Sequence, residues 1–408
     1  MNKRMCAICA LAAGMLSALS VALLAGCVQE DAPQNTVTVT FRAEGEKDVV
    51  LTTEYGGSVT PPEVPEKAGL EGWWDREEFR GFRRDTVVTA VYATEGLEYT
   101  LVESGGKSYY AVSKGEMKEG VRGLQIPSVC RGTEVKQIAA EGFSETAGLK
   151  TVVLPEGITD IGEGAFYECP QLETVNLPFG VTKIGEFSFS FCESLKAIDF
   201  PASVKSIGSY AFIGCDALKE VDIPDSVENL GRAVFCNCEG LVRATLPDGL
   251  TCISDALFSY CSSLSEIEIP AGVTSIREMA FSNTALKMIV LPENIARIEF
   301  ATFQGCSALK TVILPESLTD IEGRAFRDCI MLKTIELPDG LKSIGLEAFA
   351  ECYSIRSLTI PASVTEIGSS AFAEWDASQT IYVKGRAQMP DTGWESDCFG
   401  NATVVWNA

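Results

Sequence analysis

The chain repeats one pattern of apolar and polar positions along most of its length. From about residue 97 onward, a proline that follows an apolar pair recurs at positions 155, 178, 201, 224, 247, 270, 292, 315, 338 and 361. The interval is 23 residues, apart from one interval of 22. A unit this short cannot bury its own apolar side chains, so successive units must stack to share a core. The pattern predicts a mainly β solenoid of about eleven 23-residue coils.

Each position within the unit predicts a local structure. The motif Leu-x-x-Val-x-Leu-Pro alternates apolar residues inward, which predicts one short strand per coil, ended by a proline that has no N–H to donate. Phenylalanines recur at the same interval from Phe166 to Phe372, and we expect them to stack through the core. We expect sharp turns at the glycines after the second apolar pair. These are Gly162, Gly185, Gly208, Gly231, Gly345 and Gly368.

The two ends of the repeat carry different patterns. Residues 98–112 predict a capping hairpin that turns at Gly105 and Gly106, and residues 380–406 read as a closing cap. Before the repeat, Thr36 to Phe41 and Thr86 to Tyr92 alternate apolar and polar side chains, as strands of a small β-rich unit would. Residues 28–35 are polar and contain a proline, which is typical of a tether.

The N-terminus is a targeting segment. Lys3 and Arg4 precede an apolar run that ends in Leu24-Ala25-Gly26-Cys27, which resembles the lipobox of bacterial lipoproteins. The resemblance implies cleavage after residue 26, with acyl chains on Cys27 that hold the protein on a lipid bilayer. An ordinary cleaved signal and a single transmembrane helix are the alternatives. Stable anchoring needs more than one acyl chain, and a diacylated or triacylated cysteine meets that need.

Two further resemblances organise the chain. The motifs Tyr55-Gly56-Gly57, Pro61-Pro62 and Gly72-Trp73-Trp74 resemble the internalin-type B repeat, a β-grasp module of bacterial surface proteins. The 23-residue unit resembles the BspA-type leucine-rich repeat of the treponemal class. That resemblance implies a surface protein that binds host or neighbouring-cell proteins. The expected parts are a signal peptide (1–26), a tether (27–35), the β-grasp module (36–93), the solenoid with its capping hairpin (97–385) and a C-terminal cap (386–408).

Composition narrows the function. The chain has 56 acidic and 33 basic residues and a net charge of −23, so nucleic acid is a poor partner. It contains no histidine, which removes Ser-His and Cys-His nucleophile pairs and the commonest metal ligand. We therefore expect neither an enzyme nor a bound cofactor or metal, and a monomer.

Eight cysteines occupy one position of the repeat, three residues after the phenylalanine. They are Cys169, Cys192, Cys215, Cys238, Cys261, Cys306, Cys329 and Cys352. No Cys-x-x-Cys pair occurs among them, and the position also accepts Thr146 and Thr284. A small, weakly polar, buried slot with reduced thiols explains this better than a metal site or a disulfide framework.

The outward positions of the strands are the candidate binding surface. Two groups of side chains differ there from an ordinary solvated face. The acidic group is Asp199, Glu220, Asp222, Glu266 and Glu268, and the apolar group is Met288, Val290 and Ile313, beside the 22-residue interval. Paired carboxylates suit a glycosidase, and clustered carboxylates suit calcium. However, an open solenoid face lacks the water-excluding pocket that catalysis needs. A cluster of exposed apolar side chains marks a contact site more often than scattered apolar side chains do.

These observations favour a non-catalytic, adhesin-like protein exposed at the cell surface and anchored in the cell envelope by its lipid. Its expected ligand is a protein or a glycan, bound by the outward strand positions. The alternative is a structural spacer or scaffold in a cell-envelope assembly, and a hydrolase is a disfavoured third possibility. Fold alone does not decide between them.

Overall fold

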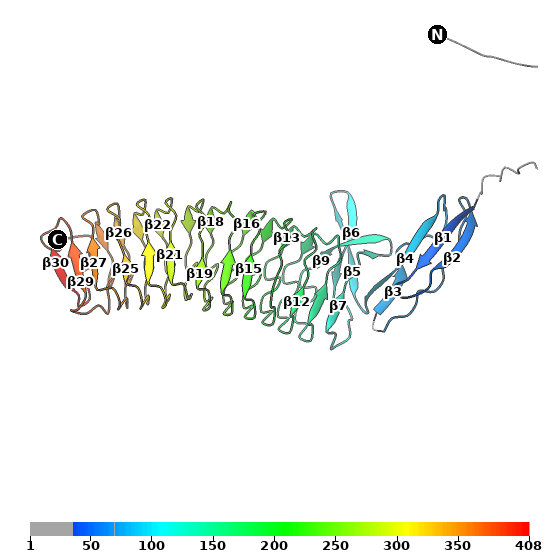
Figure 1. The fold of residues 1–408 in the computed structure, drawn as a ribbon, viewed down its shortest axis with the longest axis horizontal. Coiled ribbons are helices and arrows are strands. Elements are labelled where there is room, and N and C mark those ends of the chain that lie inside the picture. The colour runs from blue at the N-terminus through cyan, green and yellow to red at the C-terminus, as the bar shows by residue number, and fades with distance from the viewer. Residues whose placement is uncertain (1–35, 69, 408) are drawn as a thin grey trace, which may run out of the picture. The chain divides into compact units, whose positions relative to one another are not determined.

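The computed structural model describes residues 36–68 and 70–407, which contain strands and turns but no helix. The chain forms two compact units. The first comprises residues 36–42, 47–62 and 78–88, and the second comprises residues 43–46, 63–68, 70–77 and 89–407. The repeated coils all belong to the second unit (Figure 1).

Residues 36–94 contain the two strands that alternation predicts. β1 (Thr36–Arg42) buries Val37, Val39 and Phe41 and pairs antiparallel with β2 (Val49–Glu54). β4 (Thr86–Thr94) pairs antiparallel with β3 (Leu70–Trp74), and the sheet order is β2-β1-β4-β3. Both predicted strands are therefore confirmed.

The predicted strands form a parallel column, which we call the front column, although residues 197–199 occupy the predicted position of their coil without forming a strand. Its strands pair in register with residues one coil further along, as Glu220 does with Arg243. The column comprises β7 (Gly123–Gln125), β10 (Thr151–Val153), β12 (Thr174–Val175), β15 (Glu220–Asp222), β17 (Arg243–Thr245), β19 (Glu266–Ile267), β21 (Met288–Val290), β23 (Thr311–Ile313), β25 (Thr334–Ile335), β27 (Ser357–Ile360), β29 (Thr380–Val383) and β30 (Thr403–Trp406). The solenoid is confirmed, with about 13 turns rather than eleven. The two additional turns carry β29 and β30, which continue the parallel stack through residues 380–406, where the sequence predicted a closing cap.

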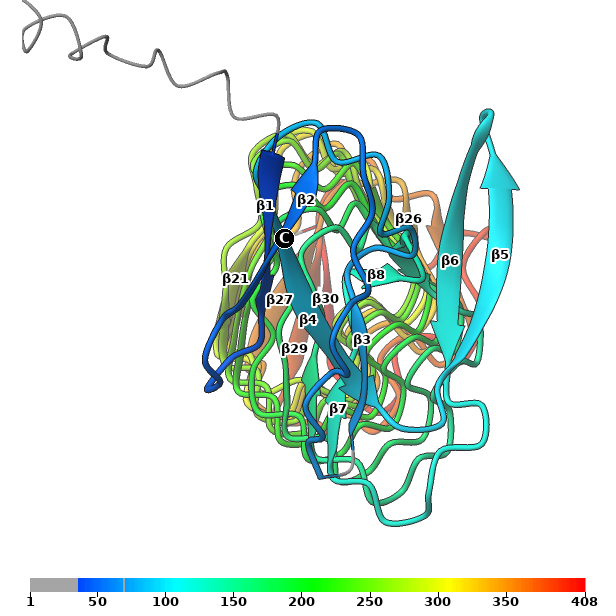
Figure 2. The same ribbon diagram turned by 90° about the vertical axis from the view of Figure 1, so that its right-hand side faces the viewer.

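Most coils also contain a second strand, which the sequence did not predict. This rear column comprises β9 (Thr133–Ile138), β11 (Asp160–Ile161), β13 (Lys183–Ile184), β14 (Ser206–Ile207), β16 (Asn229–Leu230), β18 (Cys252–Ile253), β20 (Ser275–Ile276), β22 (Arg297–Ile298), β24 (Asp320–Ile321), β26 (Ser343–Ile344) and β28 (Glu366–Ile367). The strands are parallel, and most are two residues long. A strand of two residues is too short to show an alternating pattern. Figure 2 shows the coils end-on, with front strand β21 and rear strand β26 on opposite sides.

The N-terminal end of the solenoid has the predicted hairpin. β5 (Glu98–Ser104) and β6 (Lys107–Ser113) pair antiparallel around Gly105 and Gly106, whose φ angles are 58° and 75°. Glycine adopts these left-handed angles without steric cost. β6 then pairs parallel with β9, and β8 (Val129–Cys130) pairs antiparallel with the start of β9.

The phenylalanines form one continuous ladder through the core, as expected. The rings from Phe143 to Phe372 are fully buried. Successive rings are stacked, with centroids 5.2 Å apart between Phe189 and Phe212 and 5.9 Å apart between Phe258 and Phe281. Because each ring packs against one ring in the coil before and one in the coil after, the ladder ties every coil to both of its neighbours.

The explanation expected for the glycine position is wrong. None of the six glycines has a positive φ. They are required instead because neighbouring coils approach closely: a Cβ at Gly185 would lie 2.6 Å from the backbone nitrogen of Glu163. The left-handed turns lie two residues before and two residues after the phenylalanine, for example at Tyr210 and Asp328, with φ of 59° and 61°.

Candidate binding face of the solenoid

The first and third residues of the front strands point outward, as predicted. We call these positions the front face. All eight candidate residues are exposed at these positions of their coils, although Asp199 and Glu268 lie outside the strands themselves: Asp199, Glu220, Asp222, Glu266, Glu268, Met288, Val290 and Ile313. The residues between them, such as Val221, Ile289 and Val312, are buried. The register of the exposed face was therefore predictable from the repeat.

The acidic candidates do not converge on one point. β17 places Arg243 between Glu220 and Glu266, and the Arg243 Nη2 lies 2.9 Å from the Glu220 Oε2. The hydrogen bond to Glu220 and the charges of Glu220 and Asp222 raise the pKa of Arg243. The Thr245 hydroxyl donates a hydrogen bond of 2.7 Å to Asp222.

These contacts argue against calcium at the acidic group. Two of its carboxylates already have partners within the face, an arginine for Glu220 and a hydroxyl for Asp222. Within residues 36–68 and 70–407, no three acidic or cysteine side chains are arranged to hold a metal ion. The acidic group is better described as a charged surface that alternates with bases.

The apolar candidates do come together. Val290 on β21 lies directly opposite Ile313 on β23, and Met288 is the outward neighbour of Val290 on the same strand. Their exposed fractions are 55% for Met288, 50% for Val290 and 49% for Ile313. Val153 is also exposed on this face, but its coil neighbours on β7 and β12 place polar residues beside it. The three residues form an apolar patch, whereas Val153 stands alone.

A hollow lies beside this patch, where β19 and β21 belong to different sheets. We call this place the seam. The hollow measures about 920 Å³, and Arg243, Glu266, Glu268, Lys287 and Met288 are among its lining residues. Its lining also includes Ile267, which is only partly buried although the equivalent Ala244 and Ile289 are buried. The seam coincides with the 22-residue interval of the sequence.

The seam therefore brings three of the eight candidates, Glu266, Glu268 and Met288, into one site. Sequence reasoning missed Arg243, Lys287 and Ile267 as members of it. The 22-residue interval was the one sign of this site in the sequence. It shows that a residue is missing, but it does not show that β19 and β21 lie in different sheets.

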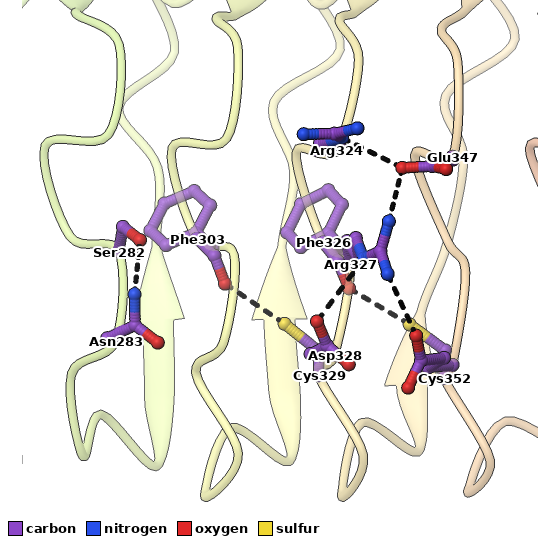
Figure 3. A network of polar contacts seen from close by, with 11 residues as sticks. Ser282, Asn283, Phe303, Arg324, Phe326, Arg327, Asp328, Cys329, Glu347 and Cys352 are labelled. Atoms are coloured by element: carbon purple, nitrogen blue, oxygen red, sulfur yellow. Dashed lines mark hydrogen bonds and ion pairs between the residues drawn. The ribbon is translucent and has the colours of Figure 1, made fainter.

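The cysteine position is a buried hydrogen-bonding slot, as predicted. All eight side chains are fully buried, and each thiol donates to the carbonyl oxygen of a phenylalanine in the preceding coil. Figure 3 shows two of these contacts, from Cys329 to Phe303 at 3.2 Å and from Cys352 to Phe326 at 3.1 Å. Burial raises the pKa of the Cys306 thiol to about 11. A neutral, buried thiol is neither a ready nucleophile nor a metal ligand.

Two other residue types fill the same slot. Thr284 donates to the carbonyl oxygen of Phe281, and its hydroxyl lies 3.2 Å from the Cys306 Sγ. The indole nitrogen of Trp375 donates to the carbonyl oxygen of Phe349 at 2.8 Å, which is the role of a thiol in other coils. The sequence did not predict this role for Trp375, because an indole and a thiol share little except a polar hydrogen.

Ion pairs also connect neighbouring coils on the side that Figure 3 shows. The Arg324 Nε lies 2.8 Å from the Glu347 Oε2, and the Arg327 Nη2 lies 3.1 Å from the Glu351 Oε1. Arg327 also pairs with Glu347 and Asp328. These partly buried pairs bridge the coils, so they belong to the scaffold and not to a binding site.

Together the stacked coils, the phenylalanine ladder and the outward strand face define a leucine-rich-repeat solenoid. The family model described as "BspA type Leucine rich repeat region" matches in six copies, over residues 123–242, 191–310, 235–330 and 274–402. The chain belongs to this family. Leucine-rich-repeat proteins generally bind other proteins, and the family is generally non-catalytic.

Solved structures of bacterial leucine-rich-repeat proteins are similar to this chain. A protein from Bacteroides ovatus is 25% identical, with a TM-score of 0.44, and the match covers 76% of this chain and 98% of that one. A protein from T. pallidum is 28% identical, with a TM-score of 0.42 and coverage of 53% and 88%. A leucine rich cell surface protein from Faecalibacterium prausnitzii is 24% identical, with a TM-score of 0.47 and coverage of 78% and 95%. None of the curated proteins compared with the chain matches it.

Two predictions from the N-terminal part fall outside these results. The matched residues begin at 123, so the internalin-type B repeat remains a prediction. Cys27 lies outside the described residues. Across residues 36–68 and 70–407, the structure has no helix with the length and apolar character needed to cross a membrane.

Proposed function

We propose that the protein is an adhesin-like, non-catalytic binding protein of the cell envelope, anchored through an acylated Cys27. Its front face captures a protein ligand at the seam. The observation that carries this proposal is the hollow between β19 and β21, which adjoins the patch of Met288, Val290 and Ile313.

The composition of this region suits a protein partner. Binding energy in interfaces concentrates in a few apolar anchors that a polar rim shields from water. The patch provides adjacent apolar side chains, each about half exposed in the free protein. Arg243, Glu266, Glu268 and Lys287 surround the hollow with charges of both signs, which favours a protein over a uniformly charged polymer.

A hydrolase remains disfavoured. The side chains of Glu220 and Arg243 are 62% and 51% exposed, and the two form an ion pair. A general acid works in a closed pocket that excludes water. Glu220 is instead exposed to solvent beside its arginine partner.

The rival proposal is a spacer, in which only the stacked core matters. We would immobilise the purified protein and measure its binding to extracellular-matrix proteins, host cells, other bacteria and purified glycans. A saturable protein ligand that the variant Met288→Lys/Ile313→Lys fails to bind supports the proposal. A ligand that the variant binds as tightly as the parent would place the site elsewhere, and no ligand in any arm would favour the spacer.

A further inference from the structure

A second site lies on the edge of the solenoid, away from the front face. It is a hollow of about 440 Å³ near the phenylalanine turn of three successive coils. Its lining consists of Phe191, Pro170 and Ala147 together with three carboxylates, Glu145, Glu168 and Glu193. We call it the edge pocket. None of its residues belongs to the front face or to the seam.

The aromatic ring of Phe191 is not part of the core. The side chain is 37% exposed, whereas the rings of the phenylalanine ladder are fully buried. It meets the ring of Tyr167 edge-on, with centroids 5.9 Å apart. Its backbone is left-handed, with a φ of 58°, a conformation that bulky residues rarely adopt. Part of the ring packs on the next coil, where a Cβ at Gly214 would lie 2.7 Å from the Phe191 Cδ1, and the rest of it lines the edge pocket.

The carboxylates around the ring are exposed, and no basic side chain neutralises them within the described residues. In the described part of the chain, no lysine or arginine forms an ion pair with Glu145, Glu168 or Glu193. Further carboxylates follow in the next coil, where burial and the charges of Glu239 and Glu193 raise the pKa of Asp216. An unneutralised group of this kind attracts cations.

An aromatic face beside several carboxylates combines two attractions for one kind of ligand. The ring quadrupole and the carboxylates both favour a positive charge, and the apolar Pro170 and Ala147 favour a cation that carries carbon. An inorganic ion gains little from the ring. We propose that the edge pocket binds an organic cation, either an ammonium or a guanidinium group.

This chemistry could come from a small molecule or from a lysine or arginine side chain of a partner. The test is ligand-observed NMR titration of the purified protein with tetramethylammonium chloride, Nα-acetyl-lysine amide and Nα-acetyl-arginine amide, each at constant ionic strength. Preferential binding of tetramethylammonium would indicate a quaternary ammonium ligand, and preferential binding of either amino-acid probe would indicate a protein segment. Both results support the proposal.

Variants separate the contributions of the ring and the charges. Phe191→Leu keeps apolar bulk but removes the quadrupole, and it should weaken binding about two- to fivefold, in line with an exposed cation–π contact. Glu168→Gln with Glu193→Gln should weaken binding and flatten its dependence on salt. The matched control is Tyr260→Leu. Tyr260 is exposed at the same position of a later coil, with a φ of 61°. The coils before and after it carry Asn237 and Asn283 at this position, where Phe191 has Glu168 and Gly214.

The proposal fails if none of the three probes shows saturable binding. A second contrary result is binding whose strength depends only on the concentration of sodium chloride, as nonspecific attraction between charges would. It also fails if Phe191→Leu binds like the parent or if Tyr260→Leu weakens binding equally. Thermal melting of each variant checks that the coils remain folded, which we expect because all the substituted side chains are exposed or partly exposed.

Discussion

Substitution of Phe281 by alanine tests the central feature of the fold, the phenylalanine ladder. Phe281 is fully buried and lies in the irregular coil, between Phe258 at 5.9 Å and Phe303 at 5.8 Å. Removing a buried ring costs about 3–5 kcal/mol when the cavity cannot close. Stacked neighbours on both sides make the upper half of that range the expected value, because a rigid ladder collapses poorly into a gap.

The form of the unfolding curve should change as well. In a solenoid each coil contacts only its neighbours, so a weakened coil in the middle reduces the coupling between the two halves. We expect Phe281→Ala to unfold in urea with a broadened or two-step transition. Three of the five tryptophans, Trp375, Trp394 and Trp406, lie in the C-terminal coils, and the other two, Trp73 and Trp74, lie before the first coil. Among the coils, tryptophan fluorescence therefore reports on the C-terminal half.

The assay is equilibrium urea unfolding followed by both far-ultraviolet circular dichroism and tryptophan fluorescence. Phe281→Leu is the matched control, and it should lose much less stability because most of the buried volume remains. A loss below about 1 kcal/mol for Phe281→Ala would contradict the reasoning, since cavities of this size cost more. Superimposable curves from the two probes would show that the halves remain coupled without the ring.

Three further predictions concern the surface, the anchor and the thiols. Met288→Lys with Ile313→Lys should weaken ligand binding at least tenfold while melting like the parent, and Val153→Lys, an equally exposed change on the same face, should do neither. Early melting of the double variant would mean that these side chains are buried. Cys27→Ser should release the protein into the soluble fraction or leave an unprocessed precursor, and normal detergent partitioning of a fully processed variant would count against lipidation. The twelve cysteines after residue 27 should titrate mostly as free thiols in denatured, unreduced protein, and four or more disulfides by intact mass would contradict this.

The repeat made the front strands, the ladder and the exposed register predictable, because a fixed interval reports which side chains must share an environment. It did not predict the rear strands, most of which are two residues long and contain a single inward residue, such as Ile184. It also gave the wrong reason for Gly185. Sequence shows that a side chain is absent, but not whether a backbone torsion or a neighbouring coil excludes it.

The candidate site was predictable only in part for a related reason. The residue types and the 22-residue interval indicated where the face is irregular. The separation of β19 from β21, which opens the hollow, depends on how two coils meet in space. Ile267 reads as an ordinary core position in the sequence, yet it is partly exposed at the seam.

Backbone hydrogen bonds between coils have both orientations: some N–H groups donate to the next coil and others donate to the preceding coil. Each end of the stack therefore has groups onto which another coil can pair. The Phe166 N–H donates forward to Ser188 in the next coil, whereas the Val242 N–H donates backward to Lys219 in the coil before. A terminal coil therefore offers both unused donors and unused acceptors to whatever follows it. During synthesis the N-terminal side of a chain emerges first, so the hairpin of β5 and β6 is available before any coil. The chain could then fold vectorially, adding one turn at a time onto a finished edge and never needing the whole chain at once.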